Sequence, residues 1–288
     1  MSIVNDCMVV NLQIGLWMGY RFDRDATRRA IYHENATEDA ARVNKHLVSK
    51  DALKRIVSAV GSLRTQFYEQ TLPWKDNGDR LLTRDMYKVF IEEHARLRDE
   101  FNNEVEHFLM VAYPRARDNA RVRLGDMFKE NDYPEVADLR RKFYVNLDID
   151  AVTVAGDFRV TLDQEHLDTV RRDIEQAVAD RISRAVGDVW ERLSDKLTHF
   201  HDKMADEKAV FKVSTVEQLQ DLVAMIPSLN VTNDPRLTQI AKDVERAIAH
   251  IDAPILRKDK AVRAAVADDV KKIMDDMAPF MAAFGGGK

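Results

Sequence analysis

One glutamate–histidine pair has the spacing of half a metal site. Glu104 and His107 form an E-x-x-H sequence, so both side chains would lie on one face of a helix. Di-iron carboxylate proteins need two such pairs and two further glutamates from neighbouring helices. The chain offers only Asp163 and His166 as a second pair, at the start of a predicted helix. A carboxylate–histidine metal enzyme is therefore the third of our three functional hypotheses.

Other residues with reactive side chains do not converge in the sequence. His199 and His201 flank Phe200 and would diverge on a helix, so they could not share a metal ion. Nothing resembles a phosphate-binding glycine loop, a nucleophile elbow or a zinc-protease helix. We therefore expect a protein that is not an enzyme and that has no catalytic residue, metal ligand or cofactor.

Two short stretches are rich in basic residues and could contact phosphate groups. They contain Arg115, Arg117, Arg121 and Arg123, followed by Arg140, Arg141 and Lys142. Helical spacing projects Arg117 and Arg121 to the same side, while Arg115 and Arg123 point elsewhere. A nucleic-acid site needs clustered basic residues, helped by aromatic rings on which bases stack. Nucleic-acid binding through these residues is our second hypothesis, and an ordinary exposed helix is the simpler interpretation.

A long helix is expected from Asp163 to about Met204. Eleven apolar residues from Leu167 to Met204 recur at a mean spacing of about 3.7 residues, close to the helical period and far from that of a strand. No proline interrupts this segment, and Asp163 can cap its start. At about 1.5 Å per residue the helix would be roughly 60 Å long, so other helices should lie along it.

Alternating apolar residues predict three strands. The first covers about residues 8–22, and its core face would carry Val10, Leu12, Ile14, Leu16, Met18, Tyr20 and Phe22. Residues 143–154 and 157–162 alternate in the same way around a turn, which predicts a hairpin. A hairpin alone is marginal in water, so we expect the N-terminal strand to pair with it in a three-stranded sheet.

Shorter helices should occupy most of the remaining sequence. They are expected at about 49–71, 83–113, 115–128, 134–142, 214–226, 234–253 and 259–280, with one more short helix after Thr37. Helices should end before Pro114 and Pro227, because proline cannot continue the interior hydrogen bonds. The Asn77-Gly78 sequence is typical of a tight turn.

Composition and charge limit the class of protein. Hydrophobic residues make up 45% and charged residues 32% of the chain, which fits a real core with solvated helix faces. The net charge is −5, so nothing draws the whole molecule to nucleic acid or anionic lipid. The single Cys7 excludes an internal disulfide. With no signal peptide and no apolar segment of 18 residues, a cytoplasmic protein without membrane contacts is expected.

Three segments together resemble a known family. They are TLPWKDNGDRLL at residues 71–82, LGDMF at 124–128 with DYP at 132–134, and GDF at 156–158. They resemble uncharacterised phage and prophage proteins, known as a domain of unknown function and sometimes encoded beside MoxR-type AAA ATPases and von Willebrand A-domain proteins. The resemblance covers roughly residues 5–200. It implies a phage-encoded protein of the host cytoplasm that is accessory to an ATPase, and it carries over no catalytic residue.

The sequence thus predicts a mostly helical α+β fold, an elongated bundle around one long helix with a small three-stranded antiparallel sheet. Residues 1–206 would form the bundle and sheet, with the long helix at 163–206. Residues 207–288 would form a C-terminal helical subdomain packed on it.

The first functional hypothesis is a non-enzymatic scaffold or adaptor that acts through helical protein–protein contacts. Its partner would be a AAA ATPase or further copies of itself. Trp74 in the turn-rich connector, and Met277 and Phe280 on the apolar side of the last helix, are the predicted partner-binding residues.

Overall fold

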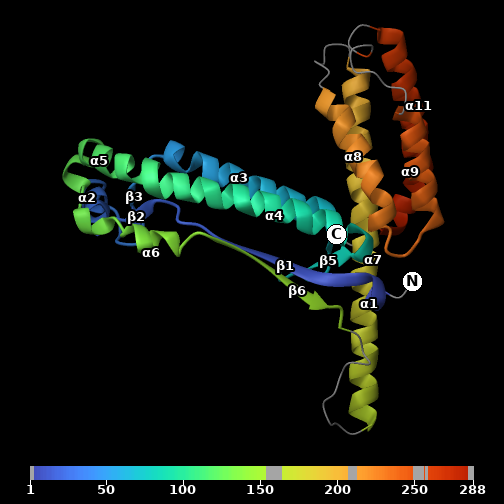
Figure 1. Cartoon of the computed structure of the whole chain (residues 1–288), viewed down its shortest axis with the longest axis horizontal. Coiled ribbons are helices and arrows are strands. Elements are labelled where there is room, and N and C mark those ends of the chain that lie inside the picture. Colours follow the sequence, from blue (N-terminus) through green and yellow to red (C-terminus); the bar gives the residue numbers. More distant parts are fainter. Residues whose placement is uncertain (1–2, 154–163, 207–212, 249–255, 257–258, 285–288) are drawn as a thin grey trace. The chain divides into compact units, whose positions relative to one another are not determined.

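The computed structural model describes residues 3–153, 164–206, 213–248, 256 and 259–284 (Figure 1). Its contacts divide the chain into two compact units. Unit 1 contains residues 1–11, 68–89 and 148–288, and unit 2 contains residues 12–67 and 90–147. The coarse prediction, a mostly helical chain with a small antiparallel sheet, is confirmed. The predicted domain boundary at residue 206 falls inside unit 1.

The main sheet has four strands rather than the predicted three. Its order is β4 (Leu72–Pro73), β5 (Arg80–Thr83), β1 (Cys7–Gly15) and β6 (Tyr144–Ala151). The extra strands arise because the Asn77-Gly78 turn, with Gly78 at a φ of 94°, folds β4 and β5 into an antiparallel hairpin. The predicted pairing of the N-terminal strand with the middle of the chain is confirmed, since β6 lies beside β1. The predicted strand at 157–162 lies outside the described residues.

Four long helices form most of unit 1. They are α7 (Gln164–Ala205), α8 (Val213–Leu229), α9 (Pro235–Ile248) and α11 (Lys260–Phe284), and a short α1 (Ile3–Asp6) precedes β1. Their facing apolar stripes form one hydrophobic core, in which Trp190 and Phe200 of α7 are fully buried. Asp234 Oδ1 caps α9 by accepting a hydrogen bond from the Arg236 N–H (2.9 Å), as the Asp-Pro sequence indicates.

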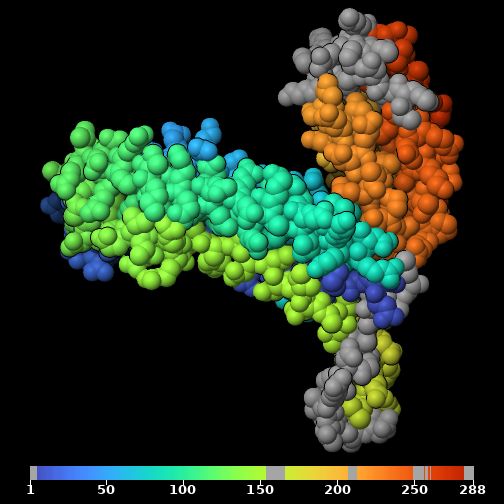
Figure 2. All heavy atoms as spheres, viewed as in Figure 1, coloured from blue at the N-terminus to red at the C-terminus, as the bar shows by residue number. Residues whose placement is uncertain are grey.

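The two halves of α7 differ in burial. Between residues 185 and 204, eight side chains are buried against α8, α9 and α11. Between residues 166 and 184 none is buried, although the apolar stripe continues through Leu167, Val170 and Ile174. In the view of Figure 2, orange and red atoms of the C-terminal helices hide the second half, whereas yellow-green atoms of the first half are visible.

Unit 2 is built on parts of two long helices, α3 (Lys50–Gln70) and α4 (Arg84–His107). The predicted α3 stripe faces a core with Phe101 and Phe108 from Leu53 to Leu63, and Phe67 at its end lies beside the Phe90 ring. Trp17 also lies in this core, 8% exposed, and its ring contacts those of Phe108 and Tyr113.

The chain passes through proline without leaving the helix at the end of α4. A π-helix (Phe108–Ala112) joins α4 to α5 (Tyr113–Leu124), so the predicted stop before Pro114 is wrong. The Tyr113 N–H donates to the Phe108 carbonyl, five residues back, and this wider register accommodates the donor that Pro114 lacks. Two 3-10 turns (Gly125–Met127 and Glu130–Asp132) and α6 (Val136–Arg140) follow.

Two further predictions from local pattern are wrong. The strand expected over 8–22 ends at Gly15, and Tyr20–Phe22 instead forms β2, which pairs with β3 (Asn44–His46) in a separate two-stranded ribbon. The chain turns between them at Gly19, whose φ of 67° favours glycine. Likewise, α8 continues through Pro227 to Leu229.

Candidate functional site

The two-stranded ribbon of unit 2 has one buried and one exposed face. Its antiparallel register pairs Arg21 with Lys45, and on the opposite face it pairs Tyr20 with His46. Lys45 is buried, whereas Tyr20 and Phe22 are 52% and 38% exposed. These two aromatic residues were predicted to face a core, so that prediction is wrong at the C-terminal end of the segment.

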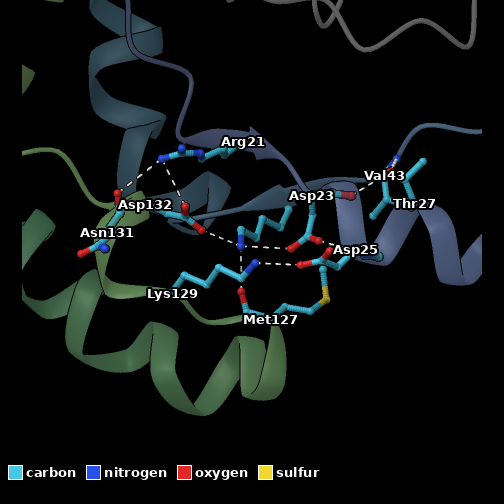
Figure 3. Close-up of polar contacts among 11 residues, drawn as sticks. Arg21, Asp23, Asp25, Thr27, Val43, Met127, Lys129, Asn131 and Asp132 are labelled. Carbon is cyan, nitrogen blue, oxygen red and sulfur yellow. Dashed lines mark hydrogen bonds and ion pairs between the residues drawn. The ribbon is translucent and has the colours of Figure 1, made fainter.

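The buried face holds a lysine whose three donors are all used. The Lys45 ammonium lies 3.0 Å from Asp23 Oδ2 and 2.5 Å from Asp132 Oδ2, and it donates to the Met127 carbonyl at 2.8 Å (Figure 3). The side chains of Lys45, Asp23 and Asp132 are less than a tenth exposed. A buried charge is tolerated only with such partners, so this cluster fixes the ribbon to the 125–132 segment.

Two further ion pairs surround this cluster at the surface. Arg21 contacts Asp132 Oδ1 at 3.2 Å from the solvent side, and Lys129 contacts Asp25 Oδ2 at 2.9 Å. Both lie close to the buried pair in Figure 3. Lys129 and Asp25 are both exposed, so their pair adds little stability, whereas Arg21 is a second counter-ion for the buried Asp132.

The charges of the buried cluster are held by their surroundings. The backbone N–H of Ala26 and then the Lys45 ammonium lower the pKa of Asp23 below its ordinary value. For Lys45, burial opposes the charge, but the bonds to Asp132 and Asp23 outweigh it and raise the pKa. Both groups are therefore ionised at neutral pH. Because the ammonium is buried and fully bonded, this lysine is a structural group rather than a nucleophile or base.

The same aspartate starts the helix that follows the ribbon. Asp23 Oδ1 accepts the Ala26 N–H at 2.8 Å and caps α2 (Arg24–His33). A Schellman motif follows the helix at Asn35, whose φ is 49°. The Asn35 N–H donates to the Tyr32 carbonyl, and the Ala36 N–H donates to the Ile31 carbonyl. This helix was missed, and the short helix expected after Thr37 is not formed.

A groove of about 710 Å³ runs along α2, and we call it the α2 groove. Its lining includes Phe22, Arg24, Arg28, Ile31, Tyr32 and Glu38. Arg24, Arg28 and Tyr32 share one side of the helix because they are four residues apart. The Arg42 guanidinium lies over the Phe22 ring, 4.7 Å from its centroid. The groove therefore combines exposed rings with cations.

Most of the predicted nucleic-acid residues have acidic or carbonyl partners. Arg117 and Arg121 both bind Glu130, Arg140 binds Glu106 and Arg141 binds Asp138. Arg123 donates to the His46 carbonyl, and Arg121 also lies over the Phe128 ring. Arg115 is exposed and forms no ion pair or hydrogen bond with any described residue. Binding of nucleic acid by these arginines stays a prediction, and it would compete with the acids that they already hold.

The glutamate–histidine pair of α4 is not part of a ligand cluster in the described chain. Glu104 Oε1 accepts a 2.6 Å bond from Arg55, and no group of three or more potential metal-ligating side chains occurs among the described residues. Asp163, the partner proposed for His166, lies outside them. Within the described ranges, no helix has the length and apolarity needed to cross a membrane.

The three predicted partner-binding residues pack within unit 1. Trp74 and Met277 are each 2% exposed, and Phe280 is half-buried against the Trp190 ring. Arg181 of α7 lies over Trp74 with its guanidinium 5.5 Å from the ring centroid. These side chains support the core, and their role in partner binding stays a prediction.

Comparison of the chain with family models, with curated proteins and with solved structures finds no match. A sequence signal for the α2 groove did exist, because Asp23 is a good N-cap and an R-x-x-x-R-x-x-x-Y pattern follows it. The polar character of residues 23–48 obscured it.

Proposed function

We propose that this protein is a non-enzymatic adaptor that binds other proteins through helical contacts, and that the first half of α7 is its principal binding surface. The observation that carries the proposal is the change in burial along one continuous helix. The stripe residues Leu167, Val170 and Ile174 are half-buried and belong to neither hydrophobic core of the described residues, whereas the same stripe is fully buried after residue 185.

Apolar residues spaced three and four apart on a solvated helix are the anchors used in helix–helix recognition. Leu167, Val170 and Ile174 would present such anchors over roughly 10 Å at about 1.5 Å per residue, and beyond them Val178 and Ile182 already pack against the core of unit 1. Arg171 and Glu175 are exposed and flank the stripe at helical spacing, so a partner helix would need charges of both signs beside its apolar face. In this proposal α7 is the rod around which the other helices of unit 1 assemble.

We propose an amphipathic helix of another protein as the occupant of this surface. The resemblance to phage proteins encoded beside MoxR-type AAA ATPases makes such an ATPase the first partner to test. A second copy of this chain is the alternative occupant, and the oligomeric state of the protein alone would reveal it.

The test is size-exclusion chromatography with light scattering, run on the protein alone and with a MoxR-type AAA ATPase. We expect complex formation by the wild-type protein and its loss in Ile174→Asp, which places a charge in the stripe. Ser183→Asp is the matched control, because it adds the same charge at an exposed position away from the stripe. The proposal would be contradicted by a monomer that binds no MoxR-type AAA ATPase, or by an equal loss of complex formation in both variants.

A further inference from the structure

We propose that the α2 groove binds single-stranded nucleic acid, with phosphates on Arg24, Arg28 and Arg42 and bases stacked on Phe22 and Tyr32. This site lies in unit 2 and is independent of the helix surface proposed above.

Two arginines that line the groove are available to bind an anion. Arg24 and Arg28 are exposed and form no ion pair or hydrogen bond with any other described residue, in contrast to Arg117, Arg121 and Arg140. The lining carries these two cations against one acid, Glu38. Lys129, and then the nearby Arg28, lower the pKa of the Asp25 carboxyl, but neither groove arginine is held in an ion pair among the described residues, so a phosphate backbone could bind here without first breaking a salt bridge.

The second argument is the presence of aromatic rings beside these cations. Tyr32 is 87% exposed, far more than a tyrosine that serves a core. Phe22 is 38% exposed, and it already stacks with the planar guanidinium of Arg42. Exposed rings interleaved with arginines are the arrangement by which proteins hold single strands, because every base has a face that can stack.

The third argument is the rigidity of the groove walls. The Asp23 cap and the Schellman motif at Asn35 fix both ends of α2. The buried Lys45 cluster fixes the ribbon that carries Phe22. A groove ordered before binding loses less conformational entropy when its ligand arrives.

A single strand fits these residues better than the other polyanions. In duplex DNA the bases are already stacked on each other, so Phe22 and Tyr32 would have no base to contact. An acidic peptide would satisfy the arginines but would offer no planar group to the rings. Duplex and acidic peptide are therefore outcomes that the experiment must separate from a single strand.

The experiment is fluorescence anisotropy with a labelled oligothymidine and a labelled oligouridine of about 20 nucleotides, long enough for typical single-strand sites. We expect salt-dependent binding by the wild-type protein. The Arg24→Ala/Arg28→Ala double variant should lose at least tenfold in affinity, and its logarithmic salt slope should fall by about 1.4, or about 0.7 for each phosphate contact. Tyr32→Ala should weaken binding by about 5- to 150-fold with an unchanged salt slope.

Matched controls are available on the same molecule. Arg29→Ala removes an exposed arginine from another side of α2, and Tyr87→Ala removes an exposed tyrosine from unit 1. Both should bind as the wild-type protein does, and so should Ile174→Asp, which separates this proposal from the adaptor function. Circular dichroism would verify that each variant is folded.

Several results would overturn the proposal. These are an absence of binding at low salt, equal losses in Arg29→Ala and in the double variant, and duplex DNA binding as tightly as the single strand. Full competition by oligoglutamate at equal charge concentration would assign the groove to acidic peptides instead.

Discussion

Lys45 of β3 forms an ion pair with Asp132, at the end of a 3-10 turn, in the interior of unit 2. Its Nζ lies 2.5 Å from Oδ2 of the aspartate. Asp23 supplies a second carboxylate at 3.0 Å, and the Met127 carbonyl accepts the remaining donor. The cluster thus joins three segments that are separate in the sequence. It also holds in place the ribbon that carries Phe22, which lines one wall of the α2 groove.

Replacing the lysine should lower the free energy of unfolding of unit 2 more than a surface substitution does. In Lys45→Met the carboxylates of Asp23 and Asp132 lose their buried counter-ion, so we expect the free energy of unfolding to fall by about 3–5 kcal/mol. Urea denaturation followed by circular dichroism measures this. Lys54→Met is the control, because Lys54 is exposed on α3 and should change stability by less than about 0.5 kcal/mol. Equal stability of the two variants would contradict the structural role of Lys45.

A buried histidine should make stability decline as the pH falls below about 6.5. His94 is 4% exposed, its ring stacks on Phe90, and its Nδ1 has no hydrogen-bond partner in the described chain. Burial, and then the nearby Arg98, lower its pKa below the ordinary value of 6.5. The unfolded state therefore binds the proton more readily, so the stabilisation is complete above about pH 6.5 and declines as the pH falls toward the folded-state pKa.

Urea titrations at several pH values would measure this effect. His94→Leu should flatten the pH dependence in that window, whereas His199→Leu, on the exposed side of α7, should leave it as in the wild-type protein. If the slope is unchanged in His94→Leu, another group controls the acid sensitivity.

The single cysteine should be unreactive in the folded protein. Cys7 lies at the start of β1 and is 6% exposed, and burial, followed by the charge of Asp6, raises the pKa of its thiol to about 11. The thiolate is the reactive form, so little of it exists at pH 8. We expect iodoacetamide to label Cys7 only after unfolding in urea, as mass spectrometry would show. Rapid labelling of the native protein would place Cys7 in a solvent-accessible site.

A close approach of backbone and ring makes Gly15 difficult to replace. A Cβ at Gly15 would lie 2.1 Å from Cε1 of Tyr144, so the ring must move in Gly15→Ala. We expect a loss of about 1–3 kcal/mol, typical of overpacking. In a Tyr144→Ala background the same change should cost much less, and a double-mutant cycle would measure the coupling. Additive effects would show that the ring is not the cause.

The two halves of α7 should respond differently to truncation. Leu193 is fully buried, so Leu193→Ala should lower the free energy of unfolding by about 2–5 kcal/mol. Ile174 is half-buried outside the core, so Ile174→Ala should cost less than about 1.5 kcal/mol. Thermal or urea denaturation of both variants tests this contrast. A similar loss in both would mean that the first half of α7 is core rather than binding surface.

Local patterns predicted the helices well, because their stripes and caps are properties of neighbouring residues. The α3 stripe is found in the structure, and Thr83 and Asp234 cap the helices that follow them. The alternating apolar pattern near the N-terminus predicted the wrong buried side chains, because a tertiary contact decides which of them are buried. Trp17, assigned to the outer face, is buried against Phe108 and Tyr113, and this contact depends on residues almost a hundred positions away.

The candidate site was harder to predict than the fold. Whether an arginine is available depends on acids brought to it by folding, such as Glu130 beside Arg117 and Arg121. Clustering in the sequence therefore pointed to arginines that the fold pairs with acids, and it did not indicate Arg24 and Arg28, which form no ion pair among the described residues. No local signal could have joined Lys45 to Asp132.

Hydrogen–deuterium exchange of residues 166–184 tests the adaptor account most directly. The measurement compares the protein alone with the protein bound to a MoxR-type AAA ATPase or assembled with its own copies. The account predicts slower amide exchange across this first half of α7 on binding, with little change in the second half, which is already buried. Unchanged exchange at 166–184 in a complex that protects another surface would contradict it.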